Sequence, residues 1–131
     1  MTTSKLPDDT LVLVTTGREA KLFRVKDGRL AQKDHWKPSD LADDGPGGST
    51  PPEYSPNEVD EATFAKQVAQ RLYGMAHKHK FTGLVLIADP QTLGQMRPLL
   101  HQAVTEKIIA EHAKTFINSP IADIERLLAV D

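Results

Sequence analysis

Two short apolar runs constrain the fold of this 131-residue chain more than any other feature. Thr10–Thr15 has the sequence TLVLVT and Gly83–Ala88 has the sequence GLVLIA. Neither run alternates between polar and apolar residues, as a strand with one solvent-exposed face does. Continuous runs of this kind are typical of strands that are buried on both faces of a sheet. The two runs therefore predict an α/β fold with helices on both faces of a sheet.

Two more strands are expected directly after the first run. Ala20–Val25 alternates along its length, and Arg29–Asp34 follows it after a two-residue connection, Asp27-Gly28. Both connecting residues tolerate the positive φ that a type I′ hairpin turn requires. The domain is thus predicted to open with three consecutive strands.

The first helix is predicted from its capping sequence. Ser55-Pro56-Asn57-Glu58 combines an N-cap hydroxyl, a proline at N1 and a glutamate at N3, which together form a capping box. The helix is expected to run to about His79. Its inward face consists of apolar residues at helical spacing, flanked by Phe64 and Met75: Ala62, Ala65, Val68, Ala69, Leu72 and Ala76.

Helices and strands then alternate to the end of the chain. Asp89-Pro90 is predicted to begin a second helix, which Pro98 is expected to break. Lys107–Glu111 is a predicted strand, and Ser119-Pro120 begins the last predicted helix. The apolar residues expected to face inward are Leu93, Met96, Leu100 and Val104 on the second helix, and Ile121, Ile124, Leu127 and Leu128 on the last. The order β-β-β-α-β-α-β-α predicts one domain over residues 1–131, with a mixed five-stranded sheet flanked by helices in a ribonuclease-H-like arrangement.

Residues 36–55 are predicted to form a long flexible loop, because they are rich in proline and glycine and have almost no apolar residues. The loop lies in an acidic stretch. Asp34–Glu61 holds eight acids and one base, a net charge of -7, so the rest of the chain carries +5 out of a total of -2. A basic protein could bind the acidic loop, whereas RNA could bind the basic remainder. The candidate RNA-contacting residues are Lys66, Arg71, Lys78, Lys80 and Arg97.

The composition also indicates the cellular compartment. The chain has no cysteine, so it can form neither disulfides nor thiolate metal sites. Its first residues lack the basic and apolar regions of a secretory signal. The longest apolar run, Leu84–Ala88, is far shorter than the roughly 20 residues of a membrane-spanning helix. We therefore expect a cytoplasmic protein with no membrane contact.

No complete catalytic or metal-binding constellation is visible. Leu11–Thr15 carries none of the acids that ribonuclease-H-like nucleases place on this strand to bind magnesium, and capping explains Asp89. His77 and His79 would point about 200° apart on one helix, which is unsuitable for a shared metal. Ser49 has no recognisable base to activate it. We expect no enzymatic activity, no metal and no cofactor.

Three segments together resemble the bacterial host-attachment protein family over nearly the whole chain. They are GLVLIADPQTLGQMR at residues 83–97, KIIAE at 107–111 and SPIADIERLL at 119–128, with Phe64-Ala65 fitting the same pattern. The domain of that family is similar to the central ribonuclease-H-like domain of archaeal and eukaryotic peptide-chain release factors. In those factors, a Gly-Gly-Gln loop helps water to cleave peptidyl-tRNA.

The resemblance places Gly47-Gly48-Ser49 at the position of the Gly-Gly-Gln loop. The two glycines match, but Ser49 stands where glutamine is expected, so we expect no peptidyl-tRNA hydrolysis. Two functions stay open. The first is a non-catalytic, release-factor-like module that contacts the ribosome or tRNA. The alternative is a protein-interaction or regulatory factor in host-cell attachment, with no nucleic-acid role.

Overall fold

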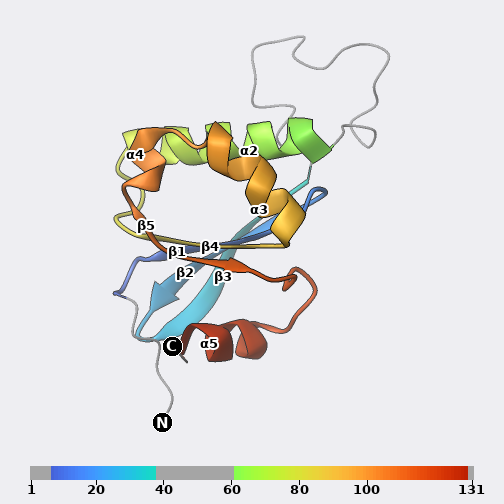
Figure 1. Cartoon of the computed structure of the whole chain (residues 1–131). Coiled ribbons are helices and arrows are strands. Elements are labelled where there is room, and N and C mark those ends of the chain that lie inside the picture. The colour runs from blue at the N-terminus through green and yellow to red at the C-terminus, as the bar shows by residue number, and fades with distance from the viewer. Residues whose placement is uncertain (1–6, 38–60, 130–131) are drawn as a thin grey trace.

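The structure is a computed structural model that describes residues 7–37 and 61–129. In these residues five strands form one mixed sheet in the spatial order β3-β2-β1-β4-β5 (Figure 1). The strands are β1 (Leu11–Thr15), β2 (Ala20–Lys26), β3 (Arg29–Trp36), β4 (Leu84–Ala88) and β5 (Ile108–Ala113). The first three are antiparallel neighbours, and β4 runs parallel to both β1 and β5. This arrangement confirms the predicted mixed sheet.

Helices cover both faces of the sheet (Figure 1). One face carries α2 (Glu61–His77), α3 (Pro90–Met96) and α4 (Gln102–Thr105), whereas α5 (Ile121–Ala129) lies on the other. No helix in the described part of the chain has the length and apolar content to cross a membrane.

The two central strands contribute side chains to two separate cores. Leu11 and Leu13 of β1 pack with α2 and α3, while Val12 and Val14 pack with α5, and none of the four is more than 1% exposed. Successive residues of a strand point to opposite faces, so a strand covered on both sides must be apolar at every position. This explains the lack of alternation in the first apolar run.

The hairpin between β2 and β3 has the predicted turn. Asp27 and Gly28 have φ angles of 53° and 76°, as a type I′ turn requires. β3, the second strand of the hairpin, is longer than predicted. It continues to Trp36, which pairs with Ala20 of β2 and is 2% exposed. The predicted loop therefore cannot begin at residue 36. Residues 38–55 of that loop, and the capping box at 55–58, lie outside the described residues.

The region around Pro98 is broken as predicted. α3 ends at Met96, the short 3-10 helix η2 (Arg97–Leu99) contains the proline, and α4 follows as a separate turn. Asp89 caps α3: its Oδ2 accepts a hydrogen bond from the Thr92 N–H at 3.1 Å, and its Oδ1 accepts one from the Thr92 hydroxyl at 2.7 Å. These two bonds confirm that capping accounts for Asp89.

The last strand and the last helix differ slightly from expectation. β5 begins one residue later than predicted and extends to Ala113, because its pairing with β4 continues to Ala88. On α5, Ile124 and Leu128 are buried, but Ile121 is 37% exposed and does not face the core. The Glu125 carboxylate accepts a hydrogen bond from the Leu30 N–H at 2.8 Å, which fastens α5 to β3.

α2 ends at His77, two residues earlier than predicted. The Lys80 N–H donates to the Met75 carbonyl at 2.9 Å, and the His79 N–H donates to the Ala76 carbonyl at 3.0 Å. This pair of bonds is a Schellman motif, in which one residue adopts the left-handed conformation. Here that residue is His79, with φ 57°. The motif ends the helix and fixes the backbone of the following residues.

Replacing His79 with glycine is expected to stabilise the protein by about 1 kcal/mol, because a left-handed residue with a Cβ is strained and glycine is not. Urea denaturation measures the difference. The same substitution at His77, the last residue of the helix, serves as the control and should lower the free energy of unfolding by about 0.5 kcal/mol. Equal effects at the two positions would contradict this explanation.

Candidate nucleic-acid interface

The outward face of α2 is exposed along its length. Apolar residues of the helix are buried against the sheet, whereas the residues at helical spacing on the other side are open to solvent: Lys66, Gln70, Tyr73 and His77. This division follows from the amphipathic pattern of the helix. The exposed face carries polar, basic and aromatic side chains together.

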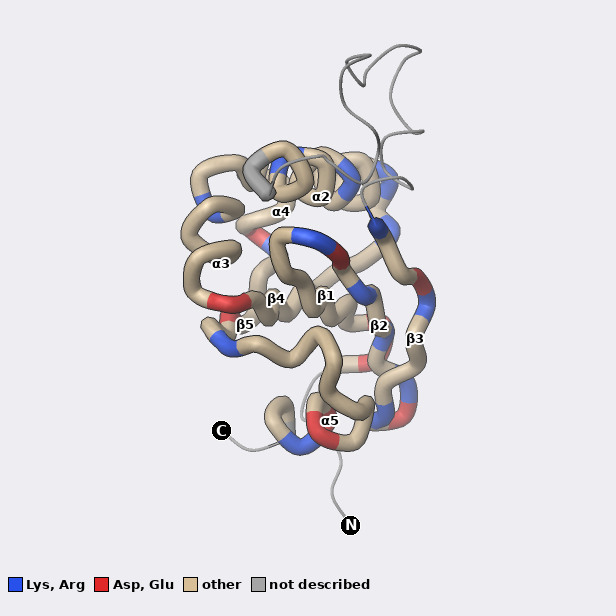
Figure 2. The backbone as a smooth tube through the Cα atoms, turned by 90° about the vertical axis from the view of Figure 1, so that its right-hand side faces the viewer, with Lys and Arg blue, Asp and Glu red and all other residues tan. Residues whose placement is uncertain are grey.

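The charge of this region has one sign. Between Thr63 and Ala88 the sequence has no aspartate or glutamate, while it has four basic residues, Lys66, Arg71, Lys78 and Lys80, besides His77 and His79. Figure 2 shows Lys and Arg segments along α2. Cations near a helix C-terminus are stabilised by the helix dipole. The region therefore presents a positive surface that attracts anions such as phosphate.

Lys78 and Lys80 are both exposed and flank the left-handed residue His79. The Lys78 N–H donates to the Gly74 carbonyl at 3.1 Å, and the Schellman bond holds Lys80. A rigid backbone thus carries two flexible ammonium groups. Of the five predicted RNA-contacting residues, these two lie closest along the chain.

Three exposed rings, Tyr73 and His77 of α2 and His101 before α4, form what we call the ring group. The centroids of Tyr73 and His101 are 4.2 Å apart, and those of Tyr73 and His77 are 6.1 Å apart. Tyr73 is 40% exposed. No local sequence pattern indicates this group, because Tyr73 lies on α2 and His101 precedes α4, and the two rings meet only where α2 packs against α4.

Two of the predicted RNA-contacting residues have other partners in the structure. The Arg71 guanidinium lies over the Trp36 ring, 5.3 Å from its centroid, in a cation–π contact that joins α2 to β3. Arg97 donates from Nε and Nη2 to Oε1 of Glu111, at 3.0 and 2.8 Å, which joins η2 to β5. The ion pair cancels the charge of Arg97. Lys66 lies on the exposed face of α2, like Tyr73.

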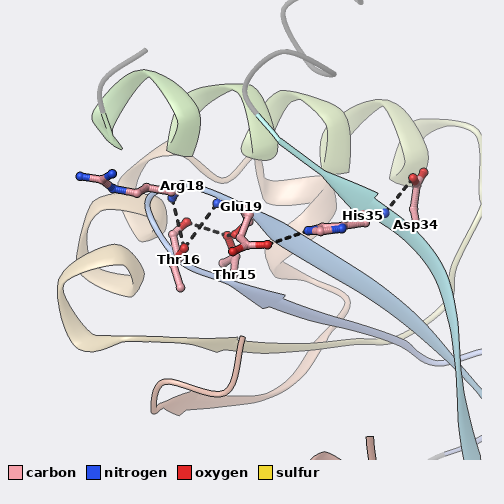
Figure 3. Close-up of polar contacts among 6 residues, drawn as sticks. All are labelled: Thr15, Thr16, Arg18, Glu19, Asp34 and His35. Carbon is pink, nitrogen blue, oxygen red and sulfur yellow. Dashed lines mark hydrogen bonds and ion pairs between the residues drawn. The ribbon is translucent and has the colours of Figure 1, made fainter. Parts of the chain in front are cut away.

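A second polar cluster lies at the carboxyl end of β1 (Figure 3). The Thr16 hydroxyl accepts hydrogen bonds from the backbone N–H groups of Arg18 and Glu19, and the Thr15 hydroxyl donates to nearby carbonyls. The Glu19 carboxylate is 2.6 Å from Nε2 of His35. These contacts order the β1–β2 turn and tie it to β3. No local sequence pattern indicates this cluster either.

The described residues contain no group of three or more His, Asp or Glu side chains that could hold a metal ion. The two places considered above for metal-binding acids are β1 and the residue that follows β4. Thr15 ends β1, and Asp89, which follows β4, is bonded to Thr92. Gly47, Gly48 and Ser49 lie outside the described residues, so their predicted correspondence to the Gly-Gly-Gln loop stays a prediction.

One protein of known structure has a similar fold. An archaeal protein of known structure superposes with a TM-score of 0.53 at 13% sequence identity, covering 92% of this chain and 36% of its own. The crystal structure of archaeal translation termination factor aRF1 superposes with a TM-score of 0.49 at 13% identity, covering 81% of this chain and 30% of its own. This chain thus spans about a third of the length of each of these proteins. No curated protein matches the sequence.

A family match covers nearly all of the sequence. Residues 9–128 match bacterial archaeo-eukaryotic release factor family 12, a range that includes every strand of the sheet and, except for the last residue of α5, the four described α-helices. The match agrees with the release-factor resemblance of the segments described above. The chain therefore belongs to bacterial archaeo-eukaryotic release factor family 12.

Proposed function

We propose that this protein is a translation-associated module of the cytoplasm that contacts ribosomal RNA or tRNA and does not hydrolyse peptidyl-tRNA. Membership of a release-factor family supports a partner in the translation machinery. The observation that carries the RNA contact is the acid-free stretch Thr63–Ala88, which holds most of α2 and the turn that follows it and in which Lys66, Lys78 and Lys80 are exposed. Phosphates bind such surfaces and release counterions on binding.

Two features of the sequence support a contact without catalysis. Ser49 stands where the resemblance to release factors expects glutamine, and its short side chain cannot extend as far toward an attacking water. The surrounding stretch, Asp34–Glu61, has a net charge of -7, which phosphate groups would repel. RNA is thus expected to bind the α2 surface and not the acidic stretch.

The proposal is tested by two measurements on the full chain. Binding to purified ribosomes and to unstructured RNA, measured at two salt concentrations, should weaken as salt rises, with a slope of roughly -0.7 per phosphate contacted. Stalled ribosomes carrying labelled peptidyl-tRNA should release no peptide above background when the protein is added. Absence of binding at low salt would refute the RNA contact, and clear peptide release would refute the non-catalytic role.

The alternative is a protein-interaction or regulatory factor in host-cell attachment, as the resemblance to the host-attachment family suggests. Its partner would be a basic protein bound to the acidic stretch. Purification of the tagged protein separates the two functions. Ribosomal particles that are released by salt support the translation role, whereas a defined protein partner that remains after nuclease treatment supports the alternative.

A further inference from the structure

We infer that the ring group of Tyr73, His77 and His101 stacks against an unpaired base of single-stranded RNA, while Lys78 and Lys80 bind the adjoining phosphates. The inference rests on the proposed RNA contact and adds the form of RNA that the site selects. It depends on three observations: the exposure of the rings, their mutual packing and the charge beside them.

The rings are held in place and yet open to solvent. Tyr73 contacts His101 at a centroid distance of 4.2 Å with the ring planes tilted by 37°, and it remains 40% exposed. Both histidines are also exposed. A large ring exposed on the surface of a helix contributes little to the core of the protein. Bases stack readily on aromatic rings that are fixed in this way.

His101 is oriented by a backbone hydrogen bond. It is the N-cap of α4, and its Nδ1 accepts a hydrogen bond from the Ala103 N–H at 3.0 Å. Since Nδ1 acts as the acceptor, the neutral ring carries its proton on Nε2. The ring therefore has a fixed position, and its Nε2–H can donate a hydrogen bond to a base edge or a phosphate oxygen.

The charges beside the ring group favour nucleic acid over a basic protein as the partner. Lys78 directly follows His77, and Lys80 lies two residues further, with no acid between Thr63 and Ala88. On the side of α4, the Glu106 carboxylate accepts a hydrogen bond from Gln102 at 3.3 Å. Stacking requires an accessible face of a base, which a continuous duplex does not offer. The ring group therefore fits single-stranded RNA.

The test uses a single-stranded oligonucleotide that contains 2-aminopurine, whose fluorescence falls when the base stacks, and a duplex of the same charge. The wild-type chain should quench the fluorescence and bind the single strand more tightly than the duplex. Tyr73→Leu removes the aromatic face but keeps an apolar side chain, and His101→Asn removes the ring but keeps an N-cap acceptor. Each variant should lose the quenching and bind the single strand about tenfold more weakly. Tyr73→Phe should behave like the wild type.

Thermal unfolding of each variant checks that the fold is intact. Quenching by both Tyr73→Leu and His101→Asn at the wild-type level would overturn the inference. So would equal affinity of the wild type for single strand and duplex, although salt-dependent binding would then still support the proposed function. If the wild type binds neither RNA at low salt, the proposed function itself is wrong.

Discussion

Replacing Phe64 with alanine should lower the free energy of unfolding by about 3–5 kcal/mol. Phe64 is fully buried in the core between α2 and the sheet, in the same cluster as Leu11, Leu13 and Leu86. Alanine would leave a cavity that the two packed layers cannot close. Because a domain has only about 5–15 kcal/mol of stability in total, the variant should unfold at a much lower urea concentration.

Gln70→Ala is the matched control, since it changes an exposed residue of the same helix and keeps good helix propensity. Its free energy of unfolding should lie within about 0.5 kcal/mol of the wild type. If Phe64→Ala lowers the free energy of unfolding by no more than Gln70→Ala does, the packing of α2 against the sheet is contradicted.

Most of the fold could be predicted because each element carries its own local signal. The apolar run Thr10–Thr15 indicated burial on both faces, Asp27-Gly28 indicated a hairpin, and Pro98 indicated a broken helix; the structure has all three. The errors lie at the ends of elements. α2 ends at His77 because a Schellman motif forms around a histidine, where sequence rules expect glycine.

The candidate site was only partly predictable, because its parts come together through tertiary packing. Lys78 and Lys80 lie two positions apart in the sequence, and both were among the predicted RNA-contacting residues. The contact of Tyr73 with His101 depends on how α4 packs on α2, which no local pattern specifies. The partners of Arg71 and Arg97 were likewise unpredictable, since both arginines bind residues of distant strands.

The Lys78→Glu/Lys80→Glu variant should bind RNA at least 25-fold more weakly at 0.1 M salt. Losing two phosphate contacts on a single strand reduces the slope of log K against log salt by about 1.4, which at this salt concentration corresponds to roughly 25-fold. The new carboxylates add repulsion to this loss. Both side chains are exposed, so the fold should be retained. Titrating fluorescent single-stranded RNA at two salt concentrations measures the affinity and the slope together.

Lys26→Glu/Lys33→Glu is the matched control for this variant. It makes the same change in net charge at exposed positions on β2 and β3, which lie in the sheet and not on α2. If RNA binds the surface of α2, the control should lose little affinity and keep the wild-type slope, because neither of its lysines lies on α2 or on the turn that follows it. Equal losses in the two variants would mean that RNA responds to the overall charge of the protein. The assignment of the interface to Lys78 and Lys80 would then be wrong.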